Sequence, residues 1–322
     1  MPTITPVVSE LEYDALKNRA AYFRPPAPGV LALTGDDAAE FLQGQVTNDV
    51  AALKVGDGVY AALLSPKGKV RADMRVLRSG GERLLVIADD ALLPLITKTI
   101  NTFKVGFRFT VTDNAGHVAL LSLIGPHSAD LLAAVVDRGA PPADGENASA
   151  PIGRGDFSAR AIRTLLGIDL LGETGDIEHF AAALDAAGVP ELSPAAAAVA
   201  RVEHGVPRFG LDFGEQNFLD EAGLNERAVS FTKGCYVGQE TVARMHYKGR
   251  PNRHLRTLSA DRPLRTGAPV VAADGRELGS VGSAVVSPGR GPIALAILRR
   301  EAGPGDSVDA GGIIARVLEP GT

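Results

Sequence analysis

The sequence contains a single cysteine, Cys235, among its 322 residues. An intrachain disulfide requires two cysteines, and an all-cysteine zinc or iron–sulfur site requires four, so this chain alone forms neither. Disulfides form mainly in oxidising compartments, and a chain that makes none is typical of a reducing one. We therefore expect a cytoplasmic protein.

The sequence also lacks a basic excess and a long apolar run. It has 33 Lys and Arg against 38 Asp and Glu, a net charge of −5, whereas non-specific nucleic-acid binding normally requires a basic surplus. The longest apolar runs, such as Val118–Ile124 and Ala195–Ala200, are far shorter than the ~20 residues that span a bilayer. The short apolar runs indicate no membrane partner, and the acidic net charge indicates no direct nucleic-acid binding. The chain does not open with a basic stretch followed by an apolar core, so we also expect no secretory signal.

Glycine and proline, by contrast, are abundant, with 37 and 21 residues. Together with 45% hydrophobic and 22% charged residues, this composition is typical of a globular protein built from many short elements joined by turns. Strands alternate with helices from Val30 to about Ile124. The expected strands are Leu31–Leu33, Tyr60–Leu64, Val70–Leu77, Leu84–Ala88 and Val118–Ile124.

Several helices are predicted from their caps and apolar spacing. Asp37 and Glu40 have the spacing of a capping box, and Ser193 before Pro194 is typical of a helix start that ends at Gly205. Further helices are expected at about 90–101 and 126–136. A last stripe, at i, i+3, i+4 and i+7, consists of Ile177, Phe180, Ala181 and Leu184.

The chain changes character after Arg253, where short β-like pieces are separated by turns such as Asp274-Gly275. No helix pattern follows, so we predict a small antiparallel β-barrel over residues 251–322. Residues 1–250 would form the α+β portion. The turn-rich stretch 138–155 marks a further sub-domain boundary inside it.

The segment with the clearest chemistry surrounds Cys235. Gly234 and Gly238 flank the thiol, and a helix predicted over Glu240–His246 would place the cysteine just before a helix N-terminus. Free N–H groups there, together with Lys233, would favour the thiolate. The alternative is a buried, inert cysteine in a glycine-rich turn, since free cysteines are among the most buried residues.

This segment resembles the signature of YgfZ-type folate-binding proteins, which are relatives of the glycine-cleavage T-protein (aminomethyltransferase). The resemblance rests on several blocks in the expected order. They are KGCYVGQE at Lys233–Glu240 with Arg244 and Arg253 behind it, FLQGQVTND at Phe41–Asp49, KGK at Lys67–Lys69, and RVEHGVP at Arg201–Pro207. The resemblance implies an aminomethyltransferase-like α+β fold with a reduced-folate pocket, followed by the C-terminal barrel.

The resemblance further implies a tetrahydrofolate-binding accessory protein for the assembly or repair of iron–sulfur enzymes, including those that modify tRNA. The expected partners are reduced folate and iron–sulfur client or assembly proteins. Cys235 would be the reacting side chain. The expected folate-binding residues are Asn48, Asp73, Asp169, Lys233, Tyr236, Gln239, Glu240 and Arg244.

Most of these residues also have a plain structural interpretation. Asp73 would be an outward-facing residue of an alternating strand, Asn48 the end of a helix, and Tyr236 a core aromatic. Gln239 and Glu240 would be first-turn helix residues, and Glu240 there complements the helix dipole. Lys233 and Arg244 would be solvated basic side chains. The basic run from Arg244 to Arg256 would be a solvated surface, or alternatively a surface that binds a partner or RNA. His204 and His246 lack a second His at ligand spacing, so we predict no metal site.

The sequence departs from the aminomethyltransferase pattern at several points. Leu219 replaces the proline of a P-x-E-x-G-L stretch, Ala72-Asp73 keeps one carboxylate of an acidic pair, and Asp169 lies in a shortened pterin-side segment. We therefore expect an accessory protein rather than an enzyme. The alternatives are a folate-dependent aminomethyl- or methyltransferase, in which a carboxylate such as Asp73 orients the acceptor amine, and a thiol redox or scaffold protein without folate.

Overall fold

The computed structural model describes residues 8–249 and 251–321, and the chain divides into two compact units. The two-sheet unit comprises Ala15–Glu191 and Glu226–Glu240. The barrel unit comprises the described residues of Met1–Asp14, Leu192–Asn225 and Thr241–Thr322. The fold is the expected mixture of α and β structure with a C-terminal antiparallel barrel, while the expected residue limits at 250 and 138–155 stay predictions.

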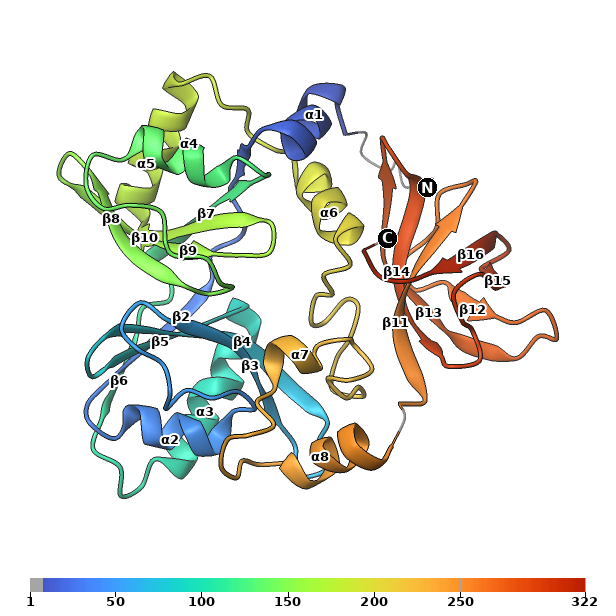
Figure 1. The fold of residues 1–322 in the computed structure, drawn as a ribbon, viewed down its shortest axis with the longest axis horizontal. Coiled ribbons are helices and arrows are strands. Elements are labelled where there is room, and N and C mark those ends of the chain that lie inside the picture. Colours follow the sequence, from blue (N-terminus) through green and yellow to red (C-terminus); the bar gives the residue numbers. More distant parts are fainter. Residues whose placement is uncertain (1–7, 250, 322) are drawn as a thin grey trace. The chain divides into compact units, whose positions relative to one another are not determined.

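The first sheet of the two-sheet unit is antiparallel, in the order β3-β4-β5-β2-β6. Its strands are β2 (Gly29–Thr34), β3 (Gly58–Leu64), β4 (Val70–Gly80), β5 (Arg83–Ala88) and β6 (Thr110–Asp113). The helices α2 (Ala38–Gln45) and α3 (Leu93–Phe103), the latter preceded by a 3-10 turn η1 (Asp90–Leu92), lie against one face (Figure 1). Phe41, Ile96 and Leu31 form part of that buried core.

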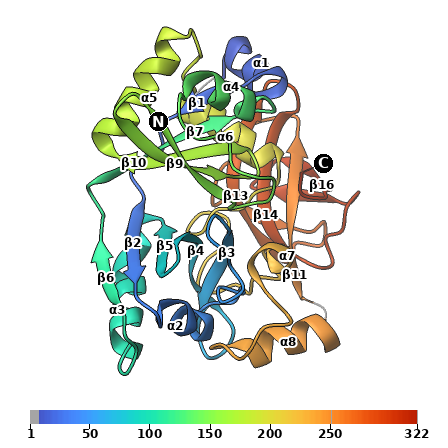
Figure 2. The same cartoon turned by 60° about the vertical axis from the view of Figure 1, so that its left-hand side comes forward.

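The second sheet has the order β1-β7-β10-β9-β8. Its strands are β1 (Ala21–Phe23), β7 (Val118–Ile124), β8 (Ser149–Arg154), β9 (Phe157–Arg163) and β10 (Gly167–Glu173). The helices α4 (Ser128–Val135) and α5 (Thr174–Ala186) cover its outer face (Figure 2). The predicted stripe from Ile177 to Leu184 is buried on α5 and packs there.

The two sheets pack against each other through a third apolar cluster, which includes Val30 and Leu85 of the first sheet and Ile162 of the second. The unit is therefore layered, with helices outside and two sheets inside. The residues of strand β4 alternate between buried and more exposed positions from Val70 to Val76. One face of the strand therefore contributes to the apolar core, and the other face presents polar side chains.

The barrel is closed in the order β11-β14-β13-β12-β15-β16. Its strands are β11 (Arg253–Ala260), β12 (Pro269–Val271), β13 (Glu277–Ser287), β14 (Gly291–Arg299), β15 (Ser307–Ala310) and β16 (Ile314–Leu318). Five of them overlap the β-like pieces that the sequence pattern predicts, which are Leu255–Leu258, Val270–Ala272, Gly282–Val286, Ile293–Ile297 and Ile313–Leu318. The sequence pattern missed β15, which has only four residues, two of them buried, and so gives little periodic signal.

The other helices of the described residues are α1 (Glu10–Asn18), α6 (Pro194–Glu203), α7 (Asn225–Ala228) and α8 (Gln239–Lys248), of which α6 packs against β13 and β14 of the barrel. The predicted caps of α6 are confirmed, because Ser193 Oγ accepts a hydrogen bond from Ala196 N at 3.2 Å and Gly205 follows the helix with φ +66°. Glu203, at the end of α6, accepts a hydrogen bond from Tyr13 at 3.0 Å and another from Ser287. The motif at Arg201–Pro207 thus organises the barrel unit.

The predicted capping box at the start of α2 is wrong. Asp37 has φ −91° and ψ 1°, and its side chain caps no helical N–H. Its Oδ2 instead accepts hydrogen bonds from Arg108 N at 2.7 Å and Arg108 Nε at 3.3 Å. A partner from the loop before β6 therefore outcompetes the local cap. Among the described residues, no helix has the length and apolar character needed to cross a membrane.

Candidate functional site

Tyr60 and Asp73 lie on the neighbouring strands β3 and β4 of the first sheet. The Tyr60 hydroxyl donates a hydrogen bond to Asp73 Oδ2 at 2.5 Å. Burial raises the pKa of Tyr60 well above its usual value, and the Asp73 carboxylate adds to this effect. The phenol therefore keeps its proton and serves as a donor that orients Asp73.

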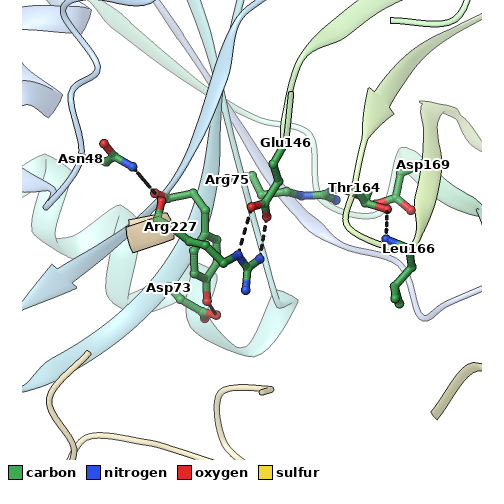
Figure 3. A network of polar contacts seen from close by, with 9 residues as sticks. Asn48, Asp73, Arg75, Glu146, Thr164, Leu166, Asp169 and Arg227 are labelled. Atoms are coloured by element: carbon green, nitrogen blue, oxygen red, sulfur yellow. Dashed lines mark hydrogen bonds and ion pairs between the residues drawn. The ribbon is translucent and has the colours of Figure 1, made fainter. Parts of the chain in front are cut away.

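Arg227 of α7 lies over this pair. Its guanidinium carbon is 5.0 Å from the centroid of the Tyr60 ring, and Glu146 holds it through Nε at 3.0 Å and Nη2 at 2.5 Å. The Asn48 amide donates to the carbonyl oxygens of Tyr60 and Arg227, each at 2.9 Å. Figure 3 shows how strand β3, α7 and the loop before β8 converge here. A bidentate arginine–carboxylate pair has well-defined geometry, so this arrangement is preorganised.

Asp169 of β10 extends the same network to the second sheet. Arg75, two residues after Asp73 on β4, donates from Nη1 to Asp169 Oδ2 at 2.6 Å, and Ser122 Oγ donates to Oδ1 at 2.6 Å (Figure 3 labels Arg75 and Asp169). Asp169 is 8% exposed. Asp73 and Arg75 project from the same face of β4 because side chains alternate along a strand. Strand β4 thus connects the hydrogen bonds around Asp73 with those around Asp169 through the neighbouring positions Asp73 and Arg75, and we call the two groups together the network.

Cys235 lies in the segment between α7 and α8 and is exposed. This observation overturns the interpretation of a buried, inert thiol. The predicted helix behind it is present as α8, which begins at Gln239. Tyr236, next to the cysteine, is buried, so its interpretation as a packed aromatic agrees with the structure.

Lys233 anchors this segment. Its Nζ donates to three backbone carbonyl oxygens, those of Gln43 at 2.6 Å, Val46 at 2.7 Å and Asn48 at 2.8 Å. Burial lowers the pKa of Lys233 to about 8, and Asp49 acts in the opposite direction. The ammonium also lies 5.1 Å from the centroid of the Tyr236 ring. All three N–H donors of Lys233 are thus used inside the chain rather than directed at the thiol or left to solvent.

Gly238 closes the segment on its other side. It has φ +85°, and a Cβ there would lie 2.6 Å from the Ser65 carbonyl oxygen. The backbone therefore comes very close to the turn that contains Lys67–Lys69, and only glycine fits. Two motifs that are far apart in sequence, KGK and KGCYVGQE, meet at this point.

The structure thus brings some predicted residues together and leaves others apart. Asn48, Asp73 and Asp169 belong to one network, and Lys233 and Tyr236 join it through the Asn48 carbonyl. Gln239 is half-buried and Glu240 exposed, both in the first turn of α8. Arg244, further along α8, is exposed and belongs to the barrel unit. Among the described residues, no hydrogen bond connects Cys235 to the network.

Sequence reasoning missed Tyr60, Glu146 and Arg227. Tyr60 looked like an ordinary strand residue, and Glu146 lies in the turn-rich stretch that was interpreted as a boundary. The roles of Glu146 and Arg227 depend on a contact between residues 81 positions apart, for which a single sequence carries no local signal. Over the described residues, no group of three or more His, Cys, Asp or Glu has the arrangement of a metal site.

Two known proteins are similar to this chain in sequence. An aminomethyltransferase of Corynebacterium jeikeium is 27% identical over 323 residues, which is 91% of this chain and 82% of the relative. A mitochondrial iron–sulfur cluster assembly factor IBA57 homolog of Mycosarcoma maydis is 28% identical over 255 residues, which is 73% of this chain and 56% of that protein.

A solved structure and a family profile agree with the fold. The crystal structure of the glycine cleavage system aminomethyltransferase T from Bartonella henselae matches with a TM-score of 0.83 and 23% identity, covering 98% of this chain and 90% of that one. The profile of the GCVT N-terminal domain matches residues 5–233, well over half of the chain. The chain therefore belongs to the aminomethyltransferase-like family that this domain defines.

Proposed function

We propose that this protein binds a reduced folate, tetrahydrofolate, in its two-sheet unit and supports the assembly or repair of iron–sulfur enzymes through Cys235. The observation that carries the proposal is the placement of the thiol. Cys235 is exposed, while Lys233 and Tyr236 on either side are 9% and 8% exposed. The segment is fixed by its neighbours and presents the thiol to solvent.

A presented thiol suits exchange with a partner. The thiolate is the form of cysteine that binds iron and acts as a nucleophile. Because a cluster normally takes four cysteine ligands, the single thiol of this chain would complete or relay a cluster held mainly by another protein. We accordingly propose iron–sulfur client or assembly proteins as partners, in a reducing, cytoplasmic environment, and tRNA-modifying iron–sulfur enzymes among the clients, as expected of a YgfZ-type protein.

The hydrogen-bond acceptors of the network fit a reduced folate. The pterin ring of a folate carries N–H donors, and its glutamate tail carries carboxylates. Asp73 and Asp169 offer carboxylate oxygens as hydrogen-bond acceptors for the N–H groups of a pterin ring. When bound, the folate would supply the capacity to carry a one-carbon unit.

The main alternative is a folate-dependent aminomethyltransferase. The orientation of Asp73 by Tyr60 favours it, because a fixed carboxylate is what an acceptor amine would need, and several relatives bear that name. Two observations favour the accessory role. Aminomethyl transfer does not require an exposed thiol, and strand β4 retains only Asp73 of the acidic pair. A thiol protein without folate is the third possibility.

Two measurements separate these functions. Calorimetric titration with tetrahydrofolate should show saturable binding to the full chain, and its absence would leave only the thiol protein without folate. Incubation with tetrahydrofolate and an aminomethylated donor should give no transfer of the one-carbon unit. Catalytic turnover in that assay would establish the transferase instead.

Cys235 alkylation by iodoacetamide provides an independent readout. Since the thiol is exposed, it should react in the folded protein at neutral pH. We expect tetrahydrofolate to slow the reaction, because Asn48 connects the network to the anchor of the cysteine segment. A thiol that reacts only after unfolding would contradict the proposal.

A further inference from the structure

The barrel unit contains a pocket of its own, about 260 Å³ in volume. It lies between the segment 210–217 and the strands β11, β13 and β14. Its lining includes four glycines, Gly210, Gly214, Gly279 and Gly282, and the polar side chains of Gln216 and Ser280. None of these residues belongs to the network or to the cysteine segment, so this pocket is separate from the proposed folate site.

The wall of the pocket is fixed by Asp212, whose side chain is fully buried. Its Oδ2 accepts hydrogen bonds from Arg201 Nη1 at 2.8 Å, Arg208 N at 2.9 Å and Ser283 Oγ at 2.9 Å. Its Oδ1 accepts one from Ser283 N at 2.7 Å. The segment 210–217 is thereby tied to strand β13, and the pocket is preformed rather than created by a ligand.

Two opposite charges line this pocket without a partner. Arg253 at the start of β11 and Glu277 at the start of β13 both border it. Within residues 8–249 and 251–321, neither side chain makes an ion pair or a hydrogen bond, to the other or to any other group. Other charged residues of the barrel do pair, as Arg256 with Glu319 at 2.9 Å and Arg276 with Asp274 at 3.5 Å.

An unmatched cation and anion on one pocket complement a ligand that carries both charges. A carboxylate is held well by a guanidinium, and an ammonium by a carboxylate. The pocket is slightly smaller than the ~300–1,000 Å³ of typical ligand pockets, so it suits a small metabolite. A ligand with only a carboxylate would use Arg253 and leave Glu277 unmatched, which disfavours a simple anion.

We propose that this pocket binds a free α-amino acid as a zwitterion, with its carboxylate at Arg253 and its ammonium at Glu277. Gln216 and Ser280 offer neutral hydrogen-bonding groups on the same lining. Arg253 is one of the residues that follow the KGCYVGQE motif, and the folate proposal gives it no role. In the amino-acid pocket, Arg253 would bind the carboxylate of the ligand.

The test screens the twenty proteinogenic amino acids against the full chain by thermal shift, and then measures the affinity of the best one by calorimetry. At least one amino acid should bind, and its N-acetyl and carboxamide derivatives, each lacking one charge, should bind at least tenfold more weakly. Arg253→Met and Glu277→Gln should each weaken binding at least tenfold. Both side chains lie partly or fully in solvent, so the melting temperature without ligand should hardly change.

Arg299→Met and Glu301→Gln are the matched controls, because both residues are exposed and neither lines the pocket. They should bind the amino acid like the unmodified chain. The proposal is overturned if no amino acid binds at about 10 mM, well above the 1 mM that corresponds to weak binding. It is also overturned if acetate or the N-acetyl derivative binds equally well, or if binding survives Arg253→Met.

Discussion

Asp73 and Tyr60 form a pair whose chemistry depends on both side chains. The buried phenol donates at 2.5 Å to one carboxylate oxygen, and its pKa is raised well above the usual value by burial and by that carboxylate. The phenol therefore keeps its proton over the physiological range and offers it to Asp73. An acceptor fixed in this way loses little entropy when a donor of the ligand binds to it.

Replacing Asp73 with Asn should weaken tetrahydrofolate binding by about 1–3 kcal/mol, the effect of losing a hydrogen bond to a charged group. Calorimetric titration measures this difference directly. Asp90→Asn is the control, because Asp90 is an exposed carboxylate at the start of η1 and should leave the affinity unchanged. Equal affinities for Asp73→Asn and the unmodified chain would remove Asp73 from the site.

The sequence predicted some of these residues but not their contacts. The KGCYVGQE block correctly placed Cys235 before a helix, because glycines and helix starts are local features. The partners of Lys233 lie 185 to 190 positions away in sequence, and Glu146 meets Arg227 across 81 positions. Such contacts arise from tertiary packing, so one sequence without relatives cannot reveal them.

At the scale of elements, the cysteine segment is held at both ends, by Lys233 and by Gly238. The two glycines beside Cys235 have different surroundings. Gly238 has φ +85° and approaches the Ser65 carbonyl closely, whereas a Cβ at Gly234 would meet nothing within 4 Å. The sequence suggested that both glycines allow a turn or a close approach, and the structure assigns that role to Gly238.

Gly238→Ala should therefore destabilise the protein by more than about 1 kcal/mol, because a Cβ there is strained by backbone conformation and by contact. Gly234→Ala is the matched variant and should change the free energy of unfolding only slightly. Denaturant titration of both variants tests this difference. If the two substitutions have the same effect, the close packing of the segment against the KGK turn is refuted.

The elements themselves were largely predictable where a periodic apolar pattern was long enough. Strands β3, β4 and β5 and the helix α5 lie where alternation and the stripe around Phe180 placed them. Capping was harder to predict. The box expected at Asp37 is absent, while Ser9 and Glu12 form one at α1, where Glu12 Oε2 accepts from Ser9 N at 2.9 Å and Glu12 N donates to Ser9 Oγ at 3.2 Å.

Glu12 also connects α1 to the start of α6, since its Oε1 accepts a hydrogen bond from Ser193 N at 2.7 Å. Burial alone would raise the pKa of Glu12, but the hydrogen bonds from Ser193 and Ser9 outweigh it and lower the pKa to about 2. The folded state thus binds the proton less readily than the unfolded chain. The stabilisation is complete above the unfolded pKa of about 4.3 and is lost as the pH falls towards 2.

Glu12→Gln should accordingly lower the free energy of unfolding at pH 7 by about 1–2 kcal/mol, a value reduced for the partial exposure of the side chain. The difference from the unmodified chain should shrink as the pH is lowered from about 4 to 2. Glu10→Gln, on the same exposed helical turn, should have little effect at any pH. A difference that stays constant down to pH 2 would contradict the assignment.

At the scale of the whole molecule, the two units supply different chemistry. The two-sheet unit carries the network and the cysteine segment, and the barrel unit carries the pocket with Arg253 and Glu277. The sequence predicted the two architectures from strand and turn patterns. It did not predict that Leu192–Asn225 clusters with the barrel, because the helical pattern of α6 resembles that of the preceding helices.

We propose that Cys235 acts on iron–sulfur enzymes without being needed for the fold. An exposed cysteine fills no core volume, so Cys235→Ala should keep the melting temperature, whereas emptying a packed site would cost about 1 kcal/mol or more. Val237→Ala, a substitution of another exposed residue of the same segment, is the control.

The decisive measurement is the activity of an iron–sulfur enzyme in cells that depend on this protein and carry one of these variants. Cys235→Ala should abolish support for that enzyme while tetrahydrofolate affinity and melting temperature stay unchanged, and Val237→Ala should retain full support. A Cys235→Ala protein that supports the enzyme as well as the unmodified chain does would show that the thiol has no such role.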